Sequence, residues 1–220
     1  MPRIPATIDT ALSSSEQPVT ESQVDAVTAW ICVTPERPRW RGVPHARTLA
    51  LRHARQPGVA VSEAWATDLP NRRSTRAVHL PLAADASVFE LLTAARRATE
   101  LALEHNPKEL LVSLHGCPPG EAAAIAEALA SAALARLVPL PVAKRTAPPA
   151  SALARIKVHG KGVVLDVPRI RAEAEGNGLV RQLAALPPNE LTPGRYRERV
   201  AQLAGERDLR YEFHDLAALK

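Results

Sequence analysis

The side chains that bind metals or carry protons are scattered along this 220-residue chain. Histidine occurs seven times, yet no two histidines form the His-Glu-x-x-His spacing or stand at ligand spacing from a cysteine or carboxylate. The histidines are His45, His53, His79, His105, His115, His159 and His214. The sequence therefore predicts no catalytic residue and no metal ligand among these residues.

One turn has a spacing that could serve an anion. The segment 115–121, His-Gly-Cys-Pro-Pro-Gly-Glu, separates an expected strand from an expected helix, where backbone N–H groups can receive a phosphate. Pro118 and Pro119 remove two of these donors, and Glu121 would repel an anion. A plain turn is the better interpretation.

Arginine is concentrated in the segment from Arg37 to Arg55. Guanidinium groups suit phosphate oxygens, and an indole can stack on a base. The candidate nucleic-acid contacts are Arg37, Arg39, Trp40, Arg41, Arg47 and Arg52. The alternative is a solvated basic face that keeps the protein soluble, and the sequence leaves both interpretations open.

Composition indicates an ordinary globular protein that is 46% apolar but only 3% aromatic, so we expect an aliphatic core carried by Ala-rich helices. The formal charge of +5 does not by itself require a polyanionic partner. The two cysteines, Cys32 and Cys117, are far apart and form no Cys-x-x-Cys pair, so we expect reduced thiols. We also expect a cytoplasmic protein, because no segment has the pattern of a signal peptide or a membrane span.

Strand-like and helix-like segments alternate along the chain. Expected strands cover 25–34, 58–65, 76–82, 108–115, 155–159, 163–167 and 209–214. Expected helices start at Ser87, whose capping box with Glu90 is clear, and near residues 121, 171, 193 and 215. The pattern predicts an α/β fold in three layers, with a mostly parallel sheet flanked by helices.

The same pattern suggests three parts. We expect a flexible leader over 1–24, an α/β domain over 25–168, and the start of a second α/β domain over 169–220. The second part contains a Pro187-Pro188-Asn189 turn, followed by a helix that Thr192 caps and Pro193 begins.

This turn and helix, with the surrounding residues 173–220, resemble the segment that opens the catalytic domain of leucyl (cytosol) aminopeptidases. Upstream, only the alternating α/β layout agrees. In this chain Pro187, Pro188, Asn189, Thr192 and Pro193 would have a structural role, because they fix a turn and begin a helix. The resemblance implies a macro-domain-like fold for the amino-terminal domain.

The resemblance also implies a function. Members of this family remove amino-terminal residues from peptides, using two divalent metals, manganese or zinc, and they form homo-oligomers that are commonly hexamers. Their ligands lie in a motif containing Asn-Thr-Asp-Ala-Glu-Gly-Arg, which does not occur in these 220 residues. We therefore expect the amino-terminal part of such an enzyme, without a cofactor in this chain and inactive alone.

Two other interpretations remain open. The chain could be a stand-alone α/β binding module for nucleic acid or a nucleotide-like ligand, through its basic segment from Arg37 to Arg55. It could also be a regulatory remnant that pairs with full-length subunits and contributes no chemistry.

Overall fold

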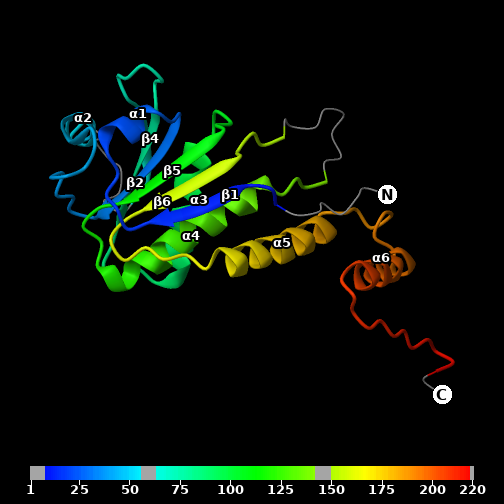
Figure 1. The fold of residues 1–220 in the computed structure, drawn as a ribbon. Coiled ribbons are helices and arrows are strands. Elements are labelled where there is room, and N and C mark those ends of the chain that lie inside the picture. Colours follow the sequence, from blue (N-terminus) through cyan, green and yellow to red (C-terminus); the bar gives the residue numbers. More distant parts are fainter. Residues whose placement is uncertain (1–7, 56–62, 142–149, 219–220) are drawn as a thin grey trace.

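A single six-stranded sheet forms the centre of the protein (Figure 1). The structure is a computed structural model that describes residues 8–55, 63–141 and 150–218. The strands, in chain order, are β1 (Ala11–Ser15), β2 (Ala29–Pro35), β3 (Trp65–Asp68), β4 (Arg76–Leu82), β5 (Glu109–Leu114) and β6 (Arg155–His159).

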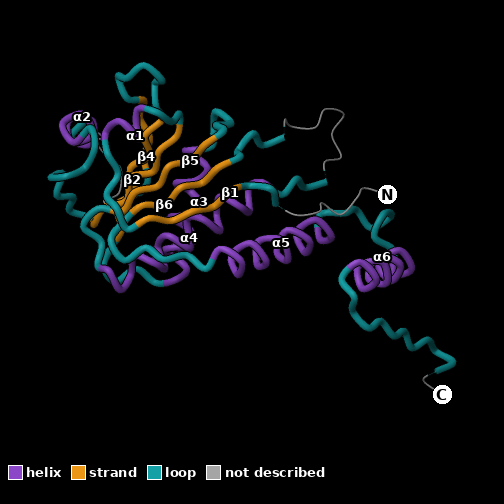
Figure 2. Tube along the Cα trace, viewed as in Figure 1, coloured by secondary structure: helices purple, strands orange, loops and turns teal. Residues whose placement is uncertain are grey.

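Helices cover the sheet on two sides (Figure 2). They are α1 (Glu21–Asp25), α2 (Ala46–His53), α3 (Val88–Ala102), α4 (Pro119–Leu137), α5 (Val167–Ala184) and α6 (Pro193–Glu206). Helices α3 and α4 pack together on one face, and α5 packs outside α4. Helices α1 and α2 cover part of the other face through Val24 and Leu49.

The strand order is β1-β6-β5-β2-β4-β3, and every neighbouring pair is parallel except β3 with β4. Parallel neighbours need a long crossover, which α4 provides between β5 and β6. Helix α3 connects β4 to β5, which lie on the two sides of β2. The prediction of a mostly parallel sheet flanked by helices is confirmed.

Strand β2 is buried on both faces of the sheet. Ala29, Ile31 and Val33 point into the larger core beneath α3 and α4. Trp30 and Cys32 point into the smaller core beneath α1 and α2. This alternation follows from the two-residue repeat of a strand and explains why the whole segment is apolar.

The local signals read most clearly from the sequence are confirmed. Ser87 accepts a hydrogen bond from the backbone N–H of Glu90, whose side chain accepts one from Ser87 N, and together they cap α3. The Thr192 side chain caps α6 by accepting a hydrogen bond from the backbone N–H of Arg195, and Pro193 lies in the first turn of the helix.

The leader predicted over 1–24 is corrected within its described part, because residues 8–24 contain β1 and most of α1. Strand β1 pairs in parallel with β6, and the Thr10 hydroxyl donates to the Leu153 carbonyl. Arg171 on α5 donates to the carbonyl of Thr10 at 2.9 Å. The sequence of β1 hides it, because three consecutive serines give no apolar alternation.

Helix α5 begins earlier than expected. The strand expected over 163–167 is wrong, since Val167 starts the helix and Asp166 caps it by accepting from Arg169 N. Ile170 and Ala174 of α5 are buried in the larger core. The helix thus begins before residue 169, where the second part was expected to start, and it is packed against the first.

The strand expected over 209–214 is also wrong, because these residues are exposed and have no neighbouring strand among the described residues. Whether such a segment forms a strand depends on pairing with a neighbouring strand and not on its β-propensity alone. The residues lead away from the sheet in Figure 1. The helix expected from residue 215 is present only as a turn, in which Asp215 accepts from the N–H groups of Ala217 and Ala218.

The strand expected over 76–82 is confirmed as β4, and it pairs in antiparallel fashion with β3 across the turn over 69–75. Of the described part of the strand expected over 58–65, only Trp65 belongs to β3, and residues 63 and 64 are not in a strand. Strand β3 begins only at Trp65. Residues 58–62 of the expected strand lie outside the described residues.

Two glycines of α5 test how closely this helix packs. A Cβ on Gly178 would lie 2.7 Å from Cγ2 of Val138 at the end of α4, whereas Gly176 has nothing within 4 Å. Gly176→Ala should stabilise the protein by up to about 1 kcal/mol, through helix propensity. Gly178→Ala should instead destabilise it by about 1 kcal/mol or more, through overpacking. Urea denaturation measures both, and equal stabilisation by the two changes would show that α5 does not pack at this distance.

Candidate functional site

The basic segment from Arg37 to Arg55 packs against the sheet through buried apolar residues. Val43 and Leu49 are buried in the smaller core and hold the loop after β2 and helix α2. His45, at the helix start, lies 2.9 Å from Asp25 Oδ1 and 3.4 Å from Glu21 Oε1, both on α1. Arg47 lies between these anchors, and Arg41 and Arg52 are near them in sequence, so the backbone that carries these exposed side chains is held against the sheet.

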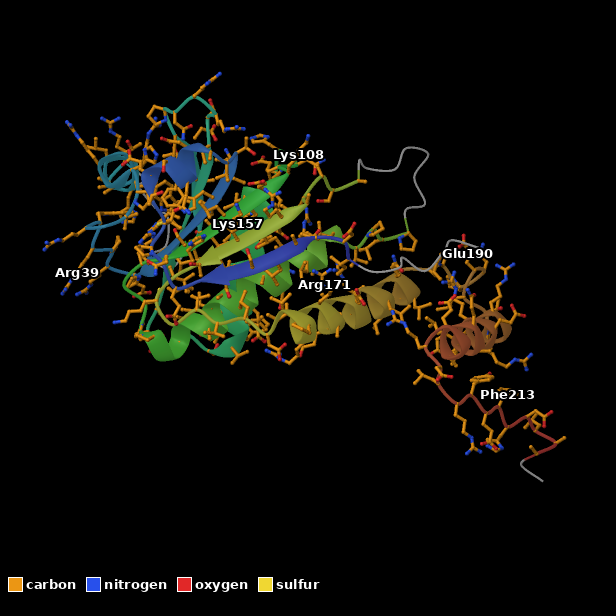
Figure 3. All side chains as sticks on the ribbon, viewed as in Figure 1. Arg39, Lys108, Lys157, Arg171, Glu190 and Phe213 are labelled. Atoms are coloured by element: carbon orange, nitrogen blue, oxygen red, sulfur yellow. The ribbon has the colours of Figure 1, made fainter. Side chains whose placement is uncertain are left out.

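All the predicted arginine contacts are exposed: Arg37, Arg39, Arg41, Arg47 and Arg52. Figure 3 shows Arg39 projecting away from the body. The residues from 37 to 55 include no Asp or Glu. Among the residues that the structure describes, these guanidinium groups form no ion pair or hydrogen bond.

Sequence reasoning missed part of this basic face. The turn between β3 and β4 adds Arg72 and Arg73, both exposed and without a side-chain partner in the described ranges. This turn is tied to α1 through Asn71, whose Nδ2 donates to Asp25 Oδ1 at 2.6 Å. We call Arg37, Arg39, Arg41, Arg47, Arg52, Arg55, Arg72 and Arg73 the arginine face. The sequence shows that residues 69–75 contain two arginines and no Asp or Glu. Their separation from the segment 37–55 in sequence gave no indication that the two segments belong together.

Trp40, a candidate for stacking on a nucleic-acid base, packs against rings of the protein itself. Its ring packs against His79, at 5.0 Å between centroids, and against His53, at 5.9 Å. Trp65 joins the same cluster at 5.4 Å from His79. The Trp40 indole is thus half-buried and holds the loop onto the sheet.

His79 is fully buried inside this ring cluster. The Thr34 hydroxyl donates to the Pro35 carbonyl, so His79 Nε2 carries the proton that it donates to Thr34 Oγ1 at 2.8 Å. Desolvation, reinforced by the nearby His53, lowers the pKa of His79 to about 3. The imidazole is therefore neutral at physiological pH.

A second buried polar network lies at the carboxyl end of β5. Trp30 Nε1 donates to Ser113 Oγ at 2.8 Å, and Ser113 Oγ is also hydrogen-bonded to His115 Nε2 at 2.8 Å. Desolvation lowers the pKa of His115 to about 4. Ser113 is only 1% exposed, so this serine and histidine are a structural pair and not an accessible nucleophile with its base.

The turn over 115–121 has few hydrogen-bond donors to offer an anion, because Pro118 and Pro119 have no backbone N–H. Pro118 caps α4 without a side-chain hydrogen bond, and Gly116 turns with a φ of 70° beneath the Pro35 ring. Burial, and then the charge of Glu121, raise the pKa of Cys117 to about 11. The two thiols are free and protonated, as expected of reduced cysteines.

No cluster of three or more His, Cys, Asp or Glu able to hold a metal occurs in residues 8–55, 63–141 and 150–218. Within the same ranges, no helix is long and apolar enough to cross a membrane.

The residues that carry the family resemblance lie at the far end from the arginine face. Pro187, Pro188, Asn189, Thr192 and Pro193 are all exposed between α5 and α6. Arg197 on α6 lies over the ring of Phe213, which follows the helix, at 4.6 Å from the ring centroid. A groove of about 1390 Å³ lies between this end and the sheet, lined by Leu153, Leu179, Leu203 and Tyr211 among others.

Solved structures share this fold across nearly the whole chain. A mutant of tomato leucine aminopeptidase matches 94% of the chain with a TM-score of 0.66 and 16% identity, and the match covers 44% of that protein. An M17 aminopeptidase from Trypanosoma brucei matches 92%, with a TM-score of 0.60, 14% identity and 42% of its own length. The bottromycin maturation enzyme BotP, solved with manganese, matches 87%, with a TM-score of 0.57, 21% identity and 40% of its length.

The likeness is one of fold. No protein-family model and no curated protein matches the sequence. The chain spans less than half the length of each of these aminopeptidase structures. The expected α/β fold is therefore confirmed, and solved aminopeptidase structures share it.

The buried His79 should make stability depend on pH. An unfolded chain takes up this proton near pKa 6.5, whereas the folded state resists it down to about 3. Stability is then complete above pH 6.5 and falls as pH is lowered towards 3, by about 2 kcal/mol at pH 5.

This prediction is checked by urea denaturation at pH 7 and pH 5. His79→Phe keeps a ring but removes the titration, so its loss of stability between these pH values should be about 2 kcal/mol smaller than that of the unaltered protein. The matched control is His105→Phe on an exposed residue, which should leave the pH dependence unchanged. Equal pH dependence in all three proteins would contradict the burial of a neutral imidazole.

Proposed function

We propose that this chain is the amino-terminal part of a leucyl aminopeptidase, a metal-dependent enzyme that removes amino-terminal residues from peptides. The observation that carries the proposal is the shared fold over 94% of the chain with tomato leucine aminopeptidase, at a TM-score of 0.66. The Pro187-Pro188-Asn189 turn and the helix that Thr192 caps support it from the sequence.

The exposed apolar side chains beyond α6 support the proposal. Leu209 is 64% exposed, Phe213 52% and Leu216 83%, in the segment that follows α6. A run of large exposed apolar side chains is unusual in a soluble protein and marks a surface that polypeptide covers. In the complete enzyme, the catalytic domain would provide that cover, with residues 209–214 pairing into its sheet.

The metals of the complete enzyme have no place on the described residues. A pair of divalent ions needs several converging carboxylates, and no such group exists in the described part of the chain. We propose that manganese or zinc is bound by the rest of the enzyme. The role of this domain is then to shape access to the active site and to support assembly as a homo-oligomer, a hexamer by resemblance, in the cytoplasm.

Sequencing the coding DNA beyond Lys220 tests this origin directly. The frame should continue into a segment that carries Asn-Thr-Asp-Ala-Glu-Gly-Arg together with the metal-binding carboxylates and lysine. A stop codon immediately after Lys220 would overturn the assignment and favour a stand-alone module or a regulatory remnant.

An activity assay of the purified 220-residue chain tests the division of labour. With leucine p-nitroanilide and added manganese, we expect no hydrolysis above a no-enzyme control, because the chain supplies no constellation of metal ligands. A longer protein that includes the downstream segment should hydrolyse the same substrate. Turnover by the 220-residue chain alone would show that its own residues include a catalytic site.

A further inference from the structure

We propose that the arginine face is a sequence-independent binding surface for the phosphate backbone of duplex nucleic acid. This inference does not rest on the aminopeptidase assignment, because it concerns a surface far from the segment that carries the resemblance. Its members are all exposed and come from the loop after β2, helix α2 and the β3–β4 turn, and Figure 3 shows Arg39 projecting away from the body.

The arginines of this face have no carboxylate partner among the described residues, whereas several arginines elsewhere in the chain do. Arg76 binds Asp68 and Glu104, Arg155 binds Glu109, and Arg169 binds three carboxylates. Within the described residues, no carboxylate reaches the guanidinium groups of the arginine face. A surface that gathers unpaired guanidinium groups produces a strong local positive potential and attracts a polyanion.

The face is also held in place before any partner arrives. Leu49 is fully buried, Val43 is 5% exposed, and Trp40 packs on His53 and His79 beneath the loop. The β3–β4 turn is fixed by Asn71, which binds both Asp25 and Thr75. Binding therefore orders only the arginine side chains, and little backbone freedom is lost.

The chemistry of the face favours phosphate over a protein surface. Residues 37–55 and 69–75 contain arginine but no lysine, and a guanidinium group offers the planar pair of donors that suits a phosphate. A protein–protein interface needs a buried apolar centre. The only large apolar side chain among the exposed hydrophobic residues in this region of the described chain is Leu51.

Duplex is favoured over single strands by the same structure. Single-strand binding depends on aromatic rings against which bases stack. Trp40 is the only aromatic residue of the basic segment, and its ring already packs against two histidines. The face can thus neutralise a duplex backbone by charge alone, without reading bases.

The test is fluorescence anisotropy of a labelled DNA duplex of mixed sequence, titrated with the full 220-residue chain at several salt concentrations. We expect a dissociation constant in the micromolar range near 50 mM salt and a slope of log K against log salt of roughly −0.9 per phosphate neutralised. Arg39→Gln/Arg41→Gln/Arg47→Gln should weaken binding at least tenfold and reduce the slope by up to about 3. These side chains have no partners, so the variant should keep the circular dichroism and stability of the unaltered protein.

The matched control is Arg96→Gln/Arg97→Gln, which removes two exposed arginines that pair with Glu100 on α3. It should bind duplex like the unaltered chain. The proposal is overturned if the chain does not bind at low salt, or if the triple variant binds as the unaltered chain does. Tighter binding to an equally charged single strand, or equal competition by polyglutamate at the same charge, would assign the face to a different partner and also refute it.

Discussion

Strand β2 is the constraint on which the other elements depend, because it lies inside the sheet between β5 and β4 and its two faces contribute to two separate cores. Its odd and even positions must both be apolar, and each neighbour must then supply a matching layer on both sides. On one side, Ala-rich α3 and α4 lie close enough to the sheet to fill the space with small side chains. On the other, short helices and bulky rings fill it, since α1 and α2 supply few side chains.

This asymmetry explains where charge and polarity are found. The side covered by α3 and α4 is aliphatic and has no need of hydrogen-bonded side chains. The other side contains Trp30, Trp65 and His79, whose polar atoms must be buried along with their rings. Ser113 and Thr34 form hydrogen bonds with Trp30 Nε1 and His79 Nε2, but Trp65 Nε1 and His79 Nδ1 have no hydrogen-bond partner among the described residues. Burying these two atoms lowers the stability of the folded state. The loop held above it is free to carry arginines because its own anchors lie beneath.

Much of the fold could be predicted because its signals are local. The capping box of α3, the Thr-Pro start of α6 and the apolar runs of β2 and β5 each identify an element from a few residues. Strand β1 could not be predicted, because its serines acquire a strand conformation only through pairing with β6. The strand expected over 209–214 failed for the opposite reason, since its β-propensity finds no partner in the described chain.

The surface was predicted in part. The exposed arginines of the basic segment were recognisable from composition, whereas Arg72 and Arg73 join them only in three dimensions. Residue type alone suggested that Trp40 could stack on a nucleic-acid base. In the structure its ring packs against His53 and His79. Burial of an aromatic ring depends on distant strands, so no local pattern could have revealed it.

The position of β1 has a consequence for how the protein is made. Its only partner in the sheet is β6, and residues 8 and 10 are also held by Arg171 and Leu153, near the other end of the chain. During synthesis, β1 emerges before the other five strands of this sheet and can pair only after β6 has emerged. The growing chain can assemble β2, β4 and β5 first, so the amino-terminal segment is the last piece of the sheet to be seated.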